Sequence, residues 1–322
     1  MQRKECINIL IVYLVLLQTT LIAQTQDSFS IGIVQADGII IPVASYDGNK
    51  WTNPWAKQRD FNNLTIETTS DIPRTWLVSN RPISQKWFLQ HFRGRLSEVN
   101  VIRPIYAKNH CGESWGLLVD MPKEPIDCDN CCPFPKVGYA LDQNHPFSKI
   151  AEIGKEDLTY HEVLSLIQQD FDKLEASALA DIPQKPISAA YSDIIKRIST
   201  TKKEPSIERL YPVYVSTNRT VFYFEAVKKY EIPDYCPIIS FFRGWVSKNK
   251  TDGTSTLLNK DYQLTDCDMK EATFLKPYAS MKIDERIYVF ANISGWESEE
   301  YAIVEIKDSQ ISELLKTFIH GF

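Results

Sequence analysis

Residues 31–46 have the sequence Ile-Gly-Ile-Val-Gln-Ala-Asp-Gly-Ile-Ile-Ile-Pro-Val-Ala-Ser-Tyr, and this stretch decides the expected fold. Runs of β-branched residues stand on both sides of Asp37-Gly38, and an Asp-Gly pair between such runs is a strong hairpin signal. Pro42 has no backbone N–H group, so its strand should be an edge strand or carry a bulge. The stretch therefore predicts an antiparallel hairpin near the start of the folded chain.

Strand signals continue on both sides of a helical middle part. Short runs of β-branched and aromatic residues, interrupted by Gly, Pro, Asn and Asp, are typical of antiparallel strands. The predicted strands cover residues 76–78, 87–89, 99–102 and 115–119 in the first half, and 213–215, 221–224, 238–245, 272–275, 286–291 and 301–306 in the second.

Helical signals lie in the middle of the chain and at its C-terminal end. Residues 159–162 (Thr-Tyr-His-Glu) match a capping box, and the apolar residues that follow fall at helical spacing until Pro183. A shorter helix is expected at 188–198 and a closing helix at 311–319. Residues 123–146 are rich in Pro, Asp and Asn, which predicts a long surface connection.

Together these signals predict an α+β protein that is mainly antiparallel β. Two β-rich units would stand on either side of a helical segment, and a short helix would end the chain. We expect a signal peptide at 1–23, a first β-rich unit with a cysteine-rich loop at 24–150, a helical segment and linker at 151–210, and a second β-rich unit with the C-terminal helix at 211–322.

The two β-rich units share an order of features, which suggests an internal duplication. Each begins with a hairpin and contains Phe-Arg-Gly in an expected strand, at 92–94 and at 242–244. Each then reaches an extended segment that ends in a cysteine, Cys111 or Cys267. Because a tripeptide is a short match, chance similarity is the alternative interpretation.

The N-terminus has the features of a secretory signal peptide. Arg3-Lys4 precedes an apolar run at residues 7–22, and Ala23 stands before a polar segment, so we predict cleavage after Ala23. The run is shorter than the roughly 20 apolar residues that a membrane-spanning helix needs. The predicted location is therefore periplasmic or extracellular, with no transmembrane segment after cleavage.

The charge balance argues against nucleic acid as a partner. The chain has 36 Lys and Arg residues against 41 Asp and Glu residues, a net charge of −5. Removal of the signal peptide takes away Arg3, Lys4 and Glu5, so the net charge changes from −5 to −6. An acidic chain without a basic stripe is poorly suited to bind nucleic acid or an anionic membrane surface.

An even number of cysteines remains after loss of Cys6 with the signal peptide. In an exported chain this favours disulfides, and six cysteines allow 15 pairings. The two-unit division predicts that Cys236 pairs with Cys267, and that Cys111 pairs with one of the cysteines at 128, 131 and 132. The predicted disulfide cysteines are Cys111, Cys128, Cys131, Cys132, Cys236 and Cys267.

The spacing of Cys128 and Cys131 also fits a thiol-redox pair or part of a zinc site. A redox pair of the thioredoxin type opens a helix, whereas Cys132-Pro133 follows here. An oxidising compartment opposes free thiols, and the five histidines show no metalloprotease spacing. We therefore predict structural cross-links, no metal and no cofactor.

Residues 112–116, Gly-Glu-Ser-Trp-Gly, fit the G-x-S-x-G motif and resemble the nucleophile elbow of the α/β-hydrolases. The resemblance implies that Ser114 is a nucleophile, with Asp268 or Asp284 and then His320 as partners. It covers five residues. The residues before the motif are polar, a proline follows too soon for a helix, and the chain lacks the strand–helix alternation of a parallel sheet.

Acidic and aromatic residues supply the remaining site candidates. Asp268 and Glu300 could act as a carboxylate pair in acid–base chemistry, and a solvated turn is the alternative for Asp268. Trp51, Trp55 and Trp296 could stack on a sugar ligand, although tryptophans more often fill a core.

The expected function is that of a non-catalytic exported protein. It would bind another protein or a carbohydrate, or contribute to an envelope or extracellular assembly. The alternative is an exported hydrolase that uses Ser114 or an acidic pair such as Asp268 and Glu300, in which His320 could also take part.

Overall fold

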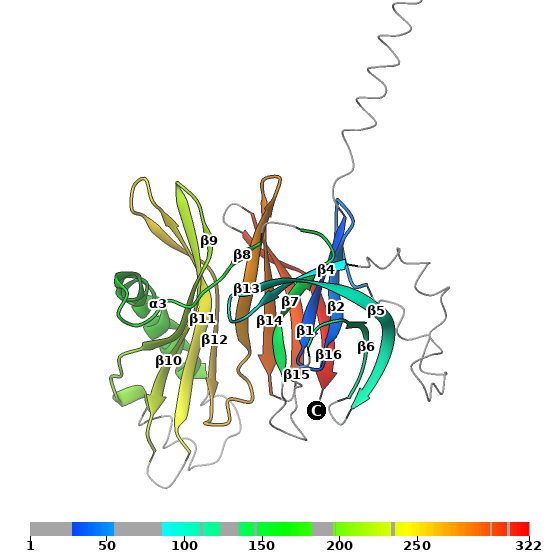
Figure 1. Cartoon of the computed structure of the whole chain (residues 1–322). Coiled ribbons are helices and arrows are strands. Elements are labelled where there is room, and N and C mark those ends of the chain that lie inside the picture. Colours follow the sequence, from blue (N-terminus) through cyan, green and yellow to red (C-terminus); the bar gives the residue numbers. More distant parts are fainter. Residues whose placement is uncertain are drawn as a thin grey trace, which may run out of the picture. The chain divides into compact units, whose positions relative to one another are not determined.

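The computed structural model describes residues 28–54, 86–109, 112–122, 135–144, 147–181, 196, 198–232, 236–296, 298–307 and 310–321 (Figure 1). They form two compact units, one within Met1–Lys108 and Glu113–Asn144, the other within Asn109–Gly112 and His145–Phe322. The structure is mainly antiparallel β with few helices, as the sequence predicts.

The first unit is a β-barrel. Its sheet has the order β1-β7-β4-β5-β6-β2-β3, and an additional β1–β2 pairing closes it. The predicted hairpin is confirmed, and the register shifts so that Val43, next to Pro42, has no partner in β1, which is the expected bulge. The strands are β1 (Phe29–Gln35), β2 (Ile39–Tyr46), β3 (Trp51–Thr52), β4 (Lys86–His91), β5 (Leu96–Asn109), β6 (Gly112–Val119) and β7 (Lys136–Leu141).

Gly116 of the G-x-S-x-G motif has a packing role in this barrel. A Cβ atom at this position would lie 2.5 Å from Cγ2 of Ile39 and 3.0 Å from the carbonyl oxygen of Ile40. Strands β6 and β2 pair at this point, so only glycine permits their close approach. The second glycine of the motif is therefore explained without a nucleophile elbow.

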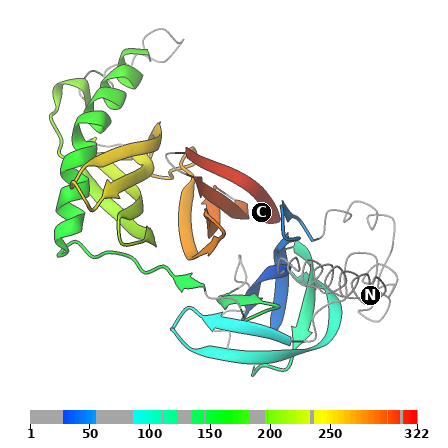
Figure 2. The ribbon, with the colours of Figure 1, turned by 90° about the horizontal axis from the view of Figure 1, so that it is seen from above.

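The second unit has three layers, which Figures 1 and 2 show as α3, the sheet of β9–β12 and the sheet of β13–β16. The four-stranded sheet has the order β12-β11-β10-β9, and the five-stranded sheet the order β16-β15-β14-β13-β8. The elements are β8 (Ser148–Lys149), α3 (Leu158–Asp181), β9 (Ser206–Val215), β10 (Arg219–Tyr230), β11 (Ile238–Asn249), β12 (Ser255–Thr265), β13 (Phe274–Ile283), β14 (Arg286–Gly295), β15 (Ser298–Lys307) and β16 (Gln310–Gly321).

Helix α3 covers the outer face of the four-stranded sheet. Its buried residues recur at helical spacing, and they pack on residues of β9, β10 and β11. The helix is therefore part of the second unit rather than a separate segment. The helix side of this contact consists of Tyr160, Val163, Ile167 and Phe171.

Asp157, and not the predicted capping box at 159–162, caps the N-terminus of α3. The backbone N–H of Thr159 donates to Oδ1 of Asp157 over 2.8 Å. This bond holds the pKa of the Asp157 carboxyl below its ordinary value. Asp at this position satisfies one of the N–H groups that lack partners at a helix start.

The inner faces of the two sheets share an apolar core, so they form a β-sandwich. On β10 the residues alternate strictly, with Val221 and Tyr223 facing this core and Phe222 and Phe224 facing α3. The core consists of Ile150, Tyr211, Val213, Val221, Tyr223, Trp245, Leu275, Ile287, Val289, Ala291, Ile293, Ala302, Val304 and Ile306.

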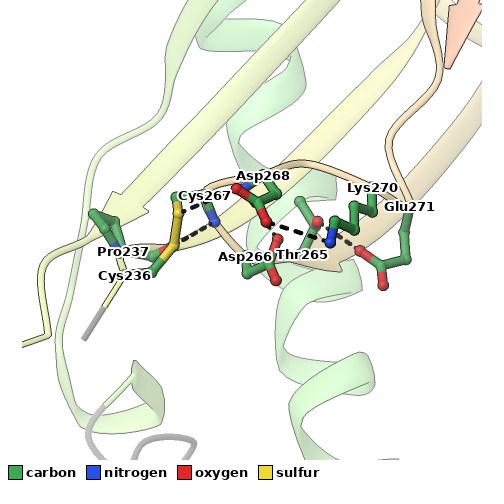
Figure 3. The surroundings of a disulfide bond; sticks show 8 residues. All are labelled: Cys236, Pro237, Thr265, Asp266, Cys267, Asp268, Lys270 and Glu271. Atoms are coloured by element: carbon green, nitrogen blue, oxygen red, sulfur yellow. Dashed lines mark hydrogen bonds and ion pairs between the residues drawn. A yellow bond between two sulfur atoms is a disulfide. The ribbon is translucent and has the colours of Figure 1, made fainter. Parts of the chain in front are cut away.

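The predicted disulfide between Cys236 and Cys267 is confirmed (Figure 3). It links the loop before β11 to the loop after β12, and the two Cα atoms are 5.7 Å apart. Both cysteines are exposed, and the backbone N–H of Cys267 donates to Sγ of Cys236 over 3.0 Å. The other predicted pairing falls on Cys111, Cys128, Cys131 and Cys132, which lie outside the described residues.

The predicted C-terminal helix at 311–319 is wrong, because β16 pairs with β15 along its length. The apolar residues Ile311, Leu314 and Leu315 have helical spacing in the sequence. In the structure, Val304 pairs with Glu313 and Ile303 with Leu315, so Leu314 is an extra residue at a bulge. The bulge breaks the two-residue alternation of the strand, and pairing to β15 overrides the local helical pattern.

The surface connection predicted for 123–146 is wrong over residues 136–141. This segment is β7, which lies between β1 and β4 in the barrel, and its Tyr139 and Ala140 are buried. Strand β12 was also not predicted, since its sequence alternates polar and apolar residues only in part. The predicted strand at 76–78 lies outside the described residues, as does most of the predicted helix at 188–198.

The two Phe-Arg-Gly tripeptides have different roles, and the internal duplication is not confirmed. Residues 92–94 lie in the turn between β4 and β5, whereas 242–244 lie inside β11. A Cβ atom on Gly244 would lie 2.4 Å from the carbonyl oxygen of Asn259, so glycine is needed where β12 crosses close to β11. The barrel and the sandwich also differ in strand order.

Candidate functional site

A cavity of about 240 Å³ lies between the two sheets of the second unit, where their edge strands β12 and β16 face each other. It is smaller than the roughly 300–1,000 Å³ of pockets that hold drug-sized ligands. Seven strands, β10 to β16, and the loop before β13 contribute to its wall. The lining includes Tyr223, Arg243, Trp245, Asp261, Ile311 and Lys316.

Two aromatic side chains form one wall of this cavity. The ring centroids of Tyr223 and Trp245 are 5.0 Å apart, with the rings tilted by 59°. They come from neighbouring strands, β10 and β11, and are directly paired in the register of the sheet. Tilted aromatic pairs at this spacing are stabilising and rigid, so the wall presents a fixed apolar surface beside Leu275 and Ile293.

A buried carboxylate behind this wall fixes the Tyr223 hydroxyl. Tyr223 donates to Oε1 of Glu225 over 3.0 Å, and the same oxygen accepts the backbone N–H of Leu275 over 2.7 Å. Burial raises the pKa of Glu225, although the Arg209 guanidinium, 3.4 Å away, acts in the opposite direction. Burial also raises the pKa of Tyr223 well above its ordinary value. The hydroxyl is therefore held as a neutral donor.

An arginine–aspartate pair supplies the polar side of the cavity. Nε and Nη2 of Arg243 contact Oδ2 of Asp261 at 3.0 and 2.9 Å, and Nη1 donates to the carbonyl of Thr273 over 2.6 Å. Arg243 and Asp261 are paired in the register of β11 and β12. Three of the five guanidinium N–H groups are thus engaged, which fixes the orientation of the side chain.

Two lysines at the cavity mouth are also paired, and Glu313 adds a further carboxylate to the lining. Lys316 lies 2.8 Å from Oε2 of Glu300, and Lys260 lies 2.7 Å from Oδ1 of Asp170 on α3. The two lysine side chains are each 41% exposed, so the cavity opens to solvent on this side. The mouth therefore offers N–H donors and carboxylate acceptors close together, with little net charge.

A second cavity, of about 650 Å³, lies beside the C-terminal part of α3. Three of its charged residues bind one another: Nζ of Lys228 is 2.7 Å from Asp172 and 2.6 Å from Glu175. Three further lysines, Lys196, Lys202 and Lys203, also line it. Glu175 also accepts hydrogen bonds from Tyr230 and Ser240. These contacts join the helix to the sheet, so their role is structural.

The structure places two of the candidate triad residues, Ser114 and His320, on strands and both aspartates in loops or turns. Ser114 lies inside β6 and its backbone is extended, so it is not on a strand-to-helix turn. His320 lies inside β16, paired with Glu299. Ser114 belongs to the first unit and both His320 and Asp268 to the second. Asp284 is in the turn between β13 and β14, with a φ of 53°.

The candidate acidic pair is divided between two ion pairs. Asp268 lies in the exposed loop after β12, 3.4 Å from Nζ of Lys270, and Figure 3 shows it next to the disulfide. Glu300 lies on β15 and pairs with Lys316 at the cavity mouth. Each carboxylate thus has a lysine partner of its own.

The predicted binding tryptophans have different environments. Trp51 is buried and packs against Phe29 and Tyr46, with ring centroids 5.5 and 5.1 Å apart, so it is a core residue. Trp296 is 48% exposed, and Nζ of Lys270 lies 4.7 Å from its ring centroid. Trp55 lies outside the described residues.

Sequence reasoning missed the residues that line the sandwich cavity. Arg243 stands in the Phe-Arg-Gly tripeptide, yet nothing local indicates that its partner is Asp261, 18 positions later. Only the register of β11 and β12 brings them together. Trp245 was assigned to a strand and not to a binding surface. The missing signal was strand pairing, which residue types and spacing do not encode.

Within the described part of the chain, no group of three or more His, Cys, Asp or Glu residues is placed to hold a metal ion. No helix among the described residues combines the length and the apolar character of a membrane span. Comparisons with protein-family models, with curated proteins and with solved structures gave no match.

Proposed function

We propose that this chain is an exported, non-catalytic binding protein and that the cavity between the two sheets of its second unit is the ligand site. The observation that carries the proposal is the composition of this cavity. It has an aromatic wall of Tyr223 and Trp245 and an oriented ion pair of Arg243 and Asp261. An aromatic surface beside polar groups of fixed orientation is a combination found in small-molecule sites.

Two further observations support export. The disulfide between Cys236 and Cys267 is the kind of cross-link that persists in an oxidising compartment. The N-terminal residues 1–23 have the pattern of a cleaved signal peptide. A secreted or periplasmic location agrees with both.

The pairing of the carboxylates supports binding rather than catalysis. A general acid or base must be free to exchange a proton with a substrate. Asp261 and Glu300 are each held by a cation within 3.0 Å, Arg243 and Lys316. The serine of the hydrolase motif lies within a strand, where the strained turn of a nucleophile elbow is missing.

The expected result of a ligand screen is a thermal shift that depends on the cavity. The mature chain, residues 24–322, is screened against neutral sugars, carboxylates, amines and amides. A ligand that binds the folded state at 100 times its Kd stabilises it by about 2.7 kcal/mol, and the melting temperature rises. The variant Ile311→Trp, which fills the cavity with a larger side chain, should lose this response.

Two controls accompany the screen. Ile311 is only partly buried, so Ile311→Trp should keep the circular dichroism spectrum and melting temperature of the free protein within a few degrees. Every ligand that shifts the wild type is recovered and checked by mass spectrometry. Chemical conversion of the ligand, or labelling of Ser114 by a fluorophosphonate, would refute a non-catalytic role.

A further inference from the structure

We propose that the ligand of the sandwich cavity is a single neutral sugar ring, either a free monosaccharide or the terminal residue of a glycan. This inference rests on the proposed function, because it assigns a ligand class to the same cavity. Three features carry it: the balance of charge, the arrangement of donors and acceptors, and the size and shape of the apolar wall.

The charge balance favours a neutral ligand. The cations of the lining are Arg243, Lys260 and Lys316. Each has a carboxylate partner at 2.7–2.9 Å, namely Asp261, Asp170 and Glu300. An incoming anion would have to displace one of these carboxylates and leave it without its cation. An incoming ammonium group would meet these three cations, against one further lining carboxylate, Glu313. A ligand without charge avoids both costs.

The polar groups are arranged as hydroxyl groups require. A hydroxyl donates one hydrogen bond and accepts others. The two contacts of Arg243 with Asp261 both go to Oδ2. Oδ1 has no hydrogen-bond partner within the described part of the chain, and the Asp261 side chain is 45% exposed. One hydroxyl could therefore donate to Asp261 and accept from Lys316, whose ammonium group carries three donors.

The apolar wall matches the C–H face of a pyranose ring. Tyr223 and Trp245 form a rigid aromatic surface, and the aliphatic side chains of Leu275, Val304 and Ile311 continue it. A sugar ring presents hydroxyl groups around its rim and C–H groups on its faces, so it can satisfy both surfaces at once. The volume of about 240 Å³ limits the buried part of the ligand to one ring.

The test uses the mature chain on an array of immobilised neutral and acidic glycans. The terminal sugar of the strongest hit is then titrated as its free methyl glycoside by calorimetry, and the corresponding uronic acid is titrated beside it. Binding of the methyl glycoside with an affinity close to that of the glycan identifies one ring as the unit recognised. Binding of the glycan alone would overturn the single-ring inference.

The decisive variant is Asp261→Asn, which removes the counter-charge of Arg243. Loss of one hydrogen bond to a charged acceptor should weaken binding of the neutral glycoside by about 10- to 100-fold. The uncovered guanidinium should at the same time strengthen binding of the uronic acid, so the preference of the cavity reverses. The matched control is Glu305→Gln, which removes a carboxylate from the Arg286 pair outside the cavity and should change neither affinity.

The outcomes separate the two proposals. Preferred binding of acidic glycans by the wild type, lost in Ile311→Trp, would overturn the neutral-sugar inference and keep the cavity as the ligand site. The wild type could also bind no glycan but show a cavity-dependent thermal shift with a non-sugar ligand. That result, too, would overturn the neutral-sugar inference and keep the cavity as the ligand site. Glycan binding that Ile311→Trp leaves unchanged would overturn both.

Discussion

Replacement of Lys228 by methionine should destabilise the second unit by about 3–5 kcal/mol, because it leaves a buried carboxylate without its cation. Lys228 is 3% exposed, and its Nζ lies 2.6 Å from Glu175 and 2.7 Å from Asp172. Glu175 is 7% exposed, so its carboxylate would stay largely buried without its cation. The contact joins α3 to β10 and should therefore decide whether the helix stays packed on the sheet.

The neighbouring groups explain why the cost falls on Glu175. Tyr230 donates to Oε1 of Glu175 over 2.9 Å, and Ser240 donates to the same oxygen over 2.5 Å. These hydroxyls satisfy one carboxylate oxygen, and Lys228 satisfies the other. Lys228 also lies 4.8 Å from the ring centroid of Phe171, so its removal costs packing against the helix as well.

A double-mutant cycle in urea unfolding measures this effect. The pair Glu175→Gln with Lys228→Met should lose less stability than the sum of the single variants, because a neutral glutamine keeps the bonds from Tyr230 and Ser240 without a buried charge. Lys248→Met, which breaks the more exposed pair with Glu162 on the same helix, is the control and should cost under about 1 kcal/mol. Equal effects of Lys228→Met and Lys248→Met would contradict the assignment.

The same lysine gives the stability a defined pH dependence. Burial lowers the pKa of Lys228, but the hydrogen bonds and charges of Asp172 and Glu175 raise it more, and the result lies above the ordinary value of 10.5. A raised folded-state pKa means that the stabilisation is complete below pH 10.5 and is lost as the pH rises through the folded-state value. The Lys228→Met variant should lack this alkaline loss.

Replacement of both cysteines of the disulfide, Cys236→Ser with Cys267→Ser, should destabilise the second unit by about 3–4 kcal/mol. The bond closes a segment with a sequence separation of 31 residues, and its loss returns that freedom to the unfolded chain. The closed segment contains all of β11 and β12, so it includes the strands that carry Arg243, Trp245 and Asp261. Ligand binding at the cavity should therefore weaken near the melting temperature of the variant.

Calorimetric melting of the oxidised wild type and of the double variant measures this contribution. A reducing agent should lower the melting temperature of the wild type. It should not change the melting temperature of a variant in which all cysteines, including Cys236 and Cys267, are replaced. If the double variant melts at the wild-type temperature, the disulfide does not constrain the unfolded chain, and its stabilising role is excluded.

The parts of the fold that the sequence predicts are those with local signals. Asp37-Gly38 fixes the first hairpin, because Gly38 adopts a φ of 86° that other residues rarely reach. The 3.6-residue period of the apolar residues correctly predicts helix α3. The predicted second β-rich unit, residues 211–322, contains only two cysteines in the sequence, and their pairing is also predicted correctly.

The parts that the sequence does not predict depend on contacts between distant segments. Leu314 produces helical spacing in β16 only because it sits at a bulge opposite β15. Strand β7 lies in a segment whose prolines and cysteines predict a loop, and its burial depends on β1 and β4 at its two edges. The cavity also depends on contacts between distant segments, because only the register of β11 and β12 brings Arg243 next to Asp261.

The most direct measurement is a crystal structure of the mature chain grown with the methyl glycoside that binds best. We expect electron density for one sugar ring between Trp245 and Lys316, with a hydroxyl within hydrogen-bond distance of Oδ1 of Asp261. A ring seated elsewhere, for example on the exposed Trp296, or a cleaved glycoside beside Ser114, would contradict it.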